Sequence, residues 1–283
     1  MSARLTVPKT YKLAIGGAFP RSESGRTYEV TTSKGAFLAN AAQASRKDVR
    51  DAVKAARTAQ AGWAKATAYN RGQVLYRVAE VLEGRRAQFV DEIVAQQGVS
   101  VAAAGAQVDE AIDLWVWYAG WCDKYAQVAG NLNPVAGAYF NISAPEPTGV
   151  VAIVAPQENA LLGLVSVVAP ALVAGNAVVV VASEQYPLSA ISLAEVLATS
   201  DLPGGVVNVL TGSPAELAPW LASHADVNAL DLAGAGGIDW VDLQIAAADT
   251  LKRVLAPGEV VSSPQRIAAF TEVKTVWHPK SMV

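Results

Sequence analysis

The sequence contains few of the residues on which metal sites, disulfides and nucleophilic catalysis depend. Among its 283 residues there is one cysteine, Cys122, and there are two histidines. One cysteine excludes an intramolecular disulfide, which is typical of proteins in reducing compartments, so we expect a cytoplasmic protein. With no cluster of His, Cys and Asp residues, the sequence predicts neither a metal site nor a nucleophile–histidine pair.

Neither positive nor negative charge predominates in the sequence, and long apolar runs are few. The net charge is −3, so we expect no basic surface for nucleic acid or an anionic membrane. The first ten residues lack the apolar segment of a signal peptide. One uncharged stretch, Asn159 to Ser183, is long enough to span a bilayer. Because Pro170 and the Gly175-Asn176 pair divide it, we expect a buried helix and strand and no membrane span.

The second half of the chain alternates short apolar runs with helical segments. From Gly149 to Glu184 an apolar run (Val150–Ala155), a polar turn, an apolar helix and a β-branched run (Val178–Val181) follow one another. This order predicts a βαβ unit with buried parallel strands. Further strands at 206–210 and 227–232 and a helix over 238–254 complete an α/β, doubly wound parallel sheet.

The first half predicts short strands and then helices. Strands are expected at 11–15, 28–30 and 37–42, and a helix begins after Ser45, with Asp48 completing a capping box. Helices at 70–83 and 85–97 and a longer one over 100–128 follow. Residues 130–147 indicate a linker or arm with a strand at 138–142, and residues 267–277 indicate an extended end.

Several of these segments, in this order, resemble the aldehyde dehydrogenase family. They are residues 147–156 (PTGVVAIVAP), 169–176 (APALVAGN) and 202–212 (LPGGVVNVLTG). In that family a cysteine thiolate attacks the aldehyde, hydride passes to NAD(P), and a glutamate-activated water releases the acid. The resemblance therefore implies three parts: a nucleophile, an oxyanion hole and a bound dinucleotide.

The catalytic residues of the family do not reappear, and we expect no catalytic residue. Cys122 precedes the βαβ unit, whereas the family's cysteine lies in a separate domain after it, so we expect Cys122 to be a buried apolar residue. Glu158 occupies the position of the oxyanion asparagine, with Asn159 one residue out of register. An ionised carboxylate cannot donate a hydrogen bond to an oxyanion. The alternative for Glu158 is a structural role at the positive end of the following helix.

The resemblance implies NAD or NADP as cofactor, with weakened binding. The family's Lys-Pro-Ser-Glu becomes Val-Ala-Ser183-Glu184, and its Phe-Thr-Gly-Ser becomes Leu-Ala-Gly234-Ala. The residues that could still bind the cofactor are Ser183, Glu184, Gly212 and Gly234. Glycines after position 233 could let a phosphate approach backbone N–H groups, or could form a plain strand-to-helix turn.

The resemblance also indicates that a whole domain is missing. Residues 251–254 (LKRV) resemble the run before the family's Glu-Leu-Gly-Gly motif, but Leu255-Ala-Pro-Gly follows, and residues 267–277 already resemble the family's last strand. We expect residues 1–133 and 148–258 to form an NAD(P)-binding-like domain of Rossmann type. Residues 134–147 and 264–283 would form an oligomerisation arm and tail, without the catalytic domain.

These expectations predict an interaction role. In the family the tail adds to the sheet of a neighbouring subunit, and here Phe270, Val273, Val276 and Trp277 would form that interface. An unpaired strand of such residues would aggregate. We therefore predict an inactive subunit that scaffolds or regulates a full-length aldehyde dehydrogenase through strand addition. The alternatives are an NAD(P)-dependent oxidoreductase, which either is active only within a heteromer or works through Glu158 or Glu184, and a nucleotide-binding module.

Overall fold

The computed structural model describes residues 5 and 7–280 and contains sheets of two, three and five strands. The strands are β1 (Thr27–Thr31), β2 (Phe37–Ala42), β3 (Asn131–Asn133), β4 (Tyr139–Pro147), β5 (Val150–Val154), β6 (Ala177–Val181), β7 (Val207–Leu210), β8 (Ala229–Asp231), β9 (Arg253–Leu255) and β10 (Thr271–Pro279). The helices are α1 (Arg46–Lys65), α2 (Ala68–Gly84), α3 (Arg86–Gln97), α4 (Val101–Trp121), α5 (Tyr125–Ala129), α6 (Leu162–Val173), α7 (Leu188–Ala198), α8 (Pro214–Ser223), α9 (Trp240–Ala248) and α10 (Pro264–Ala268). Within the described residues, no helix is both long and apolar enough to cross a membrane.

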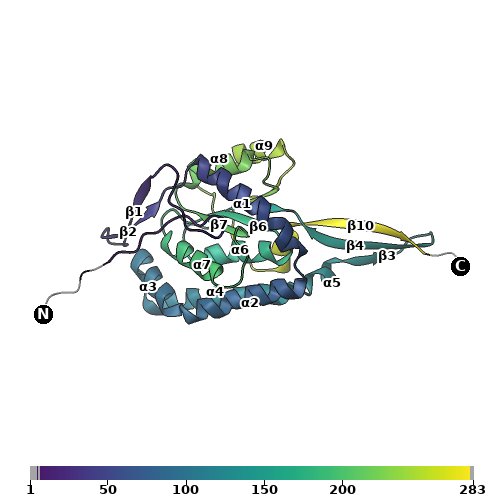
Figure 1. Ribbon diagram of the computed structural model, residues 1–283, viewed down its shortest axis with the longest axis horizontal. Helices are drawn as coiled ribbons and strands as arrows, with labels where there is room; N and C mark the ends of the chain where they lie inside the picture. The colour runs from purple at the N-terminus through teal and green to yellow at the C-terminus, as the bar shows by residue number, and fades with distance from the viewer. Residues whose placement is uncertain (1–4, 6, 281–283) are drawn as a thin grey trace.

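The five-stranded sheet confirms the predicted α/β class. Its strands are parallel in the order β7-β6-β5-β8-β9, and helices cover both faces, with α1, α8 and α9 on one and α6, α7, α4 and α2 on the other (Figure 1). Val151 and Ile153 belong to one core cluster, and Val150, Ala152 and Val154 to the other. A strand buried on both faces reads as a continuous apolar run, which is why the sequence revealed it.

The helical first half agrees with prediction in most elements. Ser45 caps α1, its backbone N–H donating to Asp48 Oδ2 at 2.7 Å in the expected capping box. The predicted strand at 11–15 is wrong, because these residues make only isolated bridges, such as Ala14 with Val209. The predicted helix over 100–128 is also wrong as one element, since tight turns after Trp121 separate α4 from α5.

Two predicted elements near the end of the chain are wrong, each for its own reason. The helix expected to reach 254 ends at Ala248, because residues 253–255 instead complete the sheet as β9 beside β8. The segment at 267–277 is not extended throughout, because the last turn of α10 comes first. Phe270 lies after that helix and is fully buried in the core. It therefore packs within this chain and is not presented to a partner, unlike Val273, Val276 and Trp277, which are exposed.

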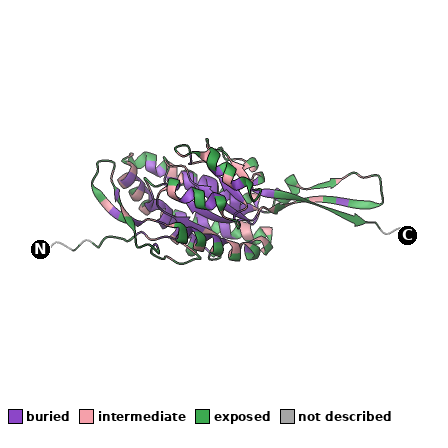
Figure 2. Cartoon of the chain, turned by 90° about the horizontal axis from the view of Figure 1, so that it is seen from above, coloured by how far each residue is buried: buried purple, intermediate pink, exposed green. Residues whose placement is uncertain are grey.

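The arm is a three-stranded antiparallel sheet in the order β10-β4-β3. It projects from the body at the end opposite β1 and β2 (Figure 1), and most of its residues are exposed (Figure 2). All nine residues of β10 pair with β4, from Thr271 opposite Pro147 to Pro279 opposite Tyr139. The sequence suggested an unpaired tail strand, but this strand pairs with β4 of its own chain. Its other edge has no strand beside it within the described residues.

Candidate functional site

A cavity of about 700 Å³ opens at the carboxyl ends of β5 and β8. Chain connections run from β5 outward through β6 and β7, and then cross to β8 and β9 on the other side. The order of the strands thus reverses between β5 and β8, and at such a point ligands bind in doubly wound sheets. Pro156 to Asn159, in the turn between the first apolar run and the helix of the βαβ unit, line this cavity.

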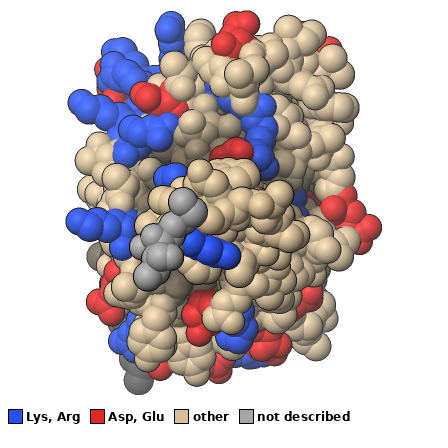
Figure 3. All heavy atoms as spheres, turned by 90° about the vertical axis from the view of Figure 1, so that its right-hand side faces the viewer, with Lys and Arg blue, Asp and Glu red and all other residues tan. Residues whose placement is uncertain are grey.

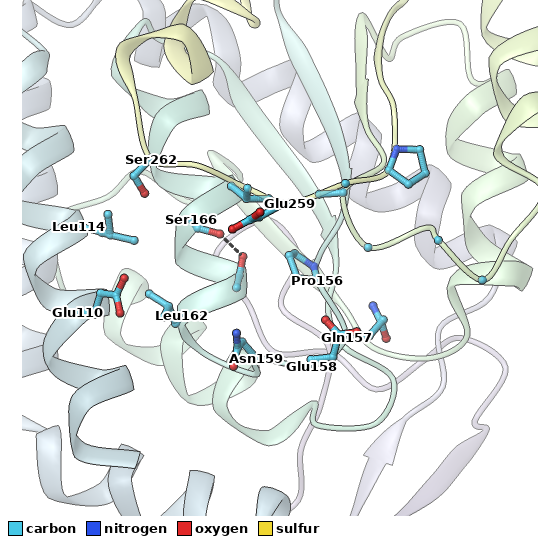
Figure 4. Close-up of a pocket in the computed structure, with 18 residues that line it drawn as sticks. Glu110, Leu114, Pro156, Gln157, Glu158, Asn159, Leu162, Ser166, Glu259 and Ser262 are labelled. Carbon is cyan, nitrogen blue, oxygen red and sulfur yellow. Dashed lines mark hydrogen bonds between the residues drawn. The ribbon is translucent and has the colours of Figure 1, made fainter. Parts of the chain in front are cut away.

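Four segments far apart in the sequence build the walls (Figure 4). The turn after β5 supplies residues 156–159 and the start of α6 supplies Leu162 and Gly163, while the turn after β8 supplies residues 233, 234, 236 and 237. Glu110 and Leu114 come from α4, and residues 257–260 and 262 come from the loop between β9 and α10. The sequence did not predict these last two contributions, because no local pattern links α4 or the loop to the sheet.

The cavity is acidic. Glu110, Glu158 and Glu259 line it from three different elements, and no lysine, arginine or histidine of the described chain is among its lining residues. Ser166 adds a hydroxyl, but this group donates to the backbone oxygen of Gly163 at 2.8 Å. Three carboxylates without a cation make the potential of the cavity negative, which opposes a pyrophosphate.

Glu158 lies at the cavity and is exposed. Its backbone oxygen accepts a hydrogen bond from Gln97 Nε2 at 3.1 Å, which ties the turn to α3. The helix α6 begins at Leu162 and has no acidic residue in its first turn, so Glu158 lies outside that turn, three residues before the N-cap Leu161. Its side-chain carboxylate contributes negative charge to the cavity.

Ser183 and Glu184 follow β6 and contact the turn after β5 rather than lining the cavity. The Ser183 hydroxyl donates to the backbone oxygen of Gln157 at 2.8 Å, and the Gln157 Oε1 accepts from the Glu184 N–H at 2.9 Å. The Gln157 amide also donates to the oxygen of Ala155 at 2.7 Å. The Gln157 side chain therefore accepts the backbone N–H that follows β6, while the Glu184 side chain is exposed to solvent.

The two glycines predicted for cofactor binding have packing reasons of their own. A Cβ on Gly234 would lie 1.8 Å from the oxygen of Ala155, so this glycine permits the β8 turn to pack on the end of β5. Gly212 follows β7 and has a φ of +126°, a backbone conformation that residues with a side chain rarely adopt. It does not line the cavity. Gly236, Gly237 and Gly258 line the cavity and have open space around their α-carbons, so a ligand could approach the backbone closely at these glycines.

Cys122 has the features of a buried structural thiol. It is 3% exposed, its Sγ lies 3.6 Å from the backbone oxygen of Tyr118, and it follows α4 away from the cavity lining. Burial raises the pKa of the thiol to about 12, although Arg71 acts in the opposite direction. A thiol that stays protonated at neutral pH cannot serve as a nucleophile.

A buried ion pair fixes the chain next to the cavity. Asp231, the last residue of β8, is fully buried and pairs with the side chain of Arg266 on α10, which is 15% exposed. Burial raises the pKa of Asp231, and Arg266 counteracts that rise. The Asp231 Oδ1 also accepts from the Ala233 N–H at 3.2 Å, at the start of the turn that lines the cavity.

Comparison with known proteins gives one consistent result. A profile described as "Aldehyde dehydrogenase family" matches residues 19–257. "Putative aldehyde dehydrogenase DhaS" of Bacillus subtilis (strain 168) is 32% identical over 249 residues, 87% of this chain and 50% of that protein. "Aldehyde dehydrogenase family 2 member B4, mitochondrial" of Arabidopsis thaliana is 34% identical over 86% of this chain and 45% of that protein.

Solved structures show the same likeness in three dimensions. An NAD+ complex of aldehyde dehydrogenase from Bacillus cereus superposes with a TM-score of 0.80 at 27% identity, covering 87% of this chain and 50% of that one. The HpcC structure from Thermus thermophilus gives 0.80 at 30% identity, covering 87% and 47%. The chain therefore spans half the length, or less, of these curated and solved relatives.

Proposed function

The chain belongs to the aldehyde dehydrogenase family, and we propose that it serves as a subunit without a catalytic centre of its own, which binds a full-length aldehyde dehydrogenase and scaffolds or regulates it. Cytoplasmic residence is part of this proposal, because a single reduced cysteine suits that compartment.

The exposed apolar arm is the observation that carries the proposal. On one face Val276 lies opposite Ile142, with Phe140 and Leu132 nearby on the same sheet, and these side chains are 45–66% exposed. On the other face the rings of Tyr139 and Trp277 meet at 5.7 Å. Figure 3 views this end of the molecule, much of which uncharged residues form. A small sheet gains stability only by burying a face, so a partner that covers the arm is expected.

The outer edge of β10 offers a second means of association. Its backbone pairs with β4 on one side only, because β10 is the edge strand of the arm. A partner strand could extend the sheet with main-chain hydrogen bonds, while the alternating side chains Val273 and Trp277 supply specificity. Natural proteins protect long edges of this kind.

The loop between β9 and α10 lies where the family resemblance places the catalytic domain. Only residues 256–263 connect β9 to α10 at this point, and the resemblance implies a whole catalytic domain there. This loop lines the cavity with Glu259. Together with the buried Cys122 and with Glu158 in place of an oxyanion donor, the loop supports a role other than aldehyde oxidation.

A dinucleotide fits the cavity poorly, although NAD-bound relatives share the fold. A pyrophosphate would face Glu110, Glu158 and Glu259 without a cation. The open backbone at Gly236 and Gly237 favours a second candidate function, a nucleotide-binding module that takes NAD or NADP. Activity as an oxidoreductase within a heteromer remains the other alternative, with the nucleophile supplied by the partner.

Co-expression with a defined full-length aldehyde dehydrogenase tests the proposal. The tagged chain should capture the partner and co-elute with it on size exclusion. Val276→Lys together with Trp277→Asp should abolish capture, because both charges would be buried in the contact. Phe37→Lys is the matched control, since Phe37 is 55% exposed on β2, at the end of the molecule opposite the arm (Figure 1).

Three outcomes would contradict parts of the proposal. Equal capture by the arm variant would reject the arm as the contact surface. A chain that is a soluble, stable monomer after deletion of residues 271–280 would remove the need for a partner. Reduction of NAD by the isolated chain with any aldehyde would contradict the absence of a catalytic centre, whereas a rise in thermal stability with NAD alone would favour the nucleotide module.

A further inference from the structure

A second cavity, about 520 Å³, lies on the outer side of the molecule, between the first turns of α1 and the end of α8. Its volume is in the range of small-molecule sites, about 300–1,000 Å³. Its polar and aromatic lining residues are Arg46, Lys47, Arg50, Trp220, Ser223 and His224. No carboxylate of the described chain lines it, so its charge is opposite to that of the cavity at β5 and β8.

The centre of this groove is a stacked pair. The guanidinium of Arg46 lies 4.2 Å from the centre of the Trp220 ring, and Trp220 is 40% exposed. None of the ion pairs among the described residues includes Arg46. Stacking fixes the guanidinium plane and leaves its edge N–H groups free, which is the geometry that binds a phosphate or carboxylate through two hydrogen bonds.

Two more cations stand beside this pair. Lys47 pairs with Glu23 at 2.5 Å, and Arg50 pairs with Asp51 at 2.8 Å. Both carboxylates lie outside the lining of the groove, whereas Lys47 and Arg50 belong to it. Exposed pairs of this kind are weak and can exchange partners at little cost.

His224 adds a hydrogen-bond donor. Its Nδ1 accepts the backbone N–H of Asp226 at 3.2 Å, which places the proton of the neutral ring on Nε2. Burial lowers the pKa of His224, and Lys252 and Arg57 act in the same direction, while the Asp226 charge opposes them. The ring is therefore neutral at neutral pH and donates through Nε2.

We propose that this groove binds a small organic anion that carries a flat ring, of the chemical class of a nucleoside monophosphate. The anionic group would accept from Arg46 and Arg50, and the flat ring would cover the exposed part of the Trp220 indole. The site is separate from the acidic cavity and from the arm, so the proposal is independent of the function proposed above.

Titration of the full chain with AMP, adenosine and inorganic phosphate tests the proposal, with binding followed by calorimetry. AMP should bind more tightly than either fragment, and added salt should weaken it. Arg46→Gln and Trp220→Leu should each weaken AMP binding about ten- to a hundredfold, as expected for loss of a charge-assisted contact or a stacking surface. Arg77→Gln, which changes an exposed arginine on α2, should bind like the wild type.

The alternatives give distinct results. Wild-type affinity for AMP in both groove variants would overturn the proposal, as would the absence of AMP binding in the millimolar range. Phosphate that binds as tightly as AMP would show that the flat ring contributes nothing and would equally reject it. Thermal unfolding of each variant at the wild-type temperature excludes misfolding as the cause of a loss, because both changes lie at the surface.

Discussion

Replacing Arg266 by methionine tests how the tail of the chain is fixed to the sheet. Asp231 is fully buried at the end of β8, and Arg266 is the cation that its carboxylate contacts. Methionine keeps much of the apolar length of the side chain but removes the charge. A buried carboxylate without its partner costs about 3–5 kcal/mol, a large share of a total folding free energy of about 5–15 kcal/mol. The stacking of Arg266 over Phe270, at 5.8 Å, would be lost as well.

Urea unfolding followed by circular dichroism measures this loss. With a slope of about 3 kcal/mol per M, the midpoint should fall by about 1–1.7 M. Arg86→Met is the matched control, because Arg86 pairs with Asp109 at 2.6 Å on the surface. The control should unfold with nearly the wild-type midpoint. If Arg266→Met did the same, the ion pair would not fix the tail as the structure indicates.

The pH dependence of the same variant supplies an independent check. Burial raises the pKa of Asp231, so the native state keeps this proton to a higher pH than the unfolded chain does. Stability from this group is therefore present at low pH and is lost as pH rises above about 3.9, through the pKa of the folded state. Without Arg266 that pKa rises further, so the destabilisation should be small at acidic pH and grow toward pH 8. In the double variant with Asp231→Asn this growth should disappear; its persistence would refute the reasoning.

The remaining predictions concern stability and reactivity. Gly234→Ala should destabilise the chain by about 1–3 kcal/mol in thermal unfolding, because its Cβ would overlap the backbone after β5, whereas Gly236→Ala should have little effect since open space surrounds it. Cys122 should react with a thiol reagent only on unfolding, since burial raises its pKa to about 12; rapid labelling of the native chain would contradict this. Asp48→Ala should lower stability by about 0.5–2 kcal/mol in urea unfolding, because its carboxylate accepts from the Ser45 N–H in the capping box; an unchanged midpoint would show that the cap contributes nothing.

The sequence by itself determined the elements whose signals are local. The β-branched runs that became β5 and β6 were placed within a residue, because strands buried on both faces need apolar residues at every position. The start of α1 followed from Ser45 and Asp48, which lie three residues apart. The doubly wound sheet followed from the alternation of apolar runs with helical segments, and the family followed from several short segments in one order.

Only the tertiary structure decided what depends on contacts between distant segments. Residues 253–255 became β9 because the edge of β8 offered backbone partners, although their sequence continued a helical pattern. Glu110 and Glu259 joined Glu158 around one cavity, and no spacing along the chain announces that meeting. Phe270 turned into the core while Trp277, seven residues later, remained exposed on the arm. The burial and the electrostatic potential of a site depend on all the residues that surround it. Because those residues come from distant parts of the sequence, only the folded chain brings them together.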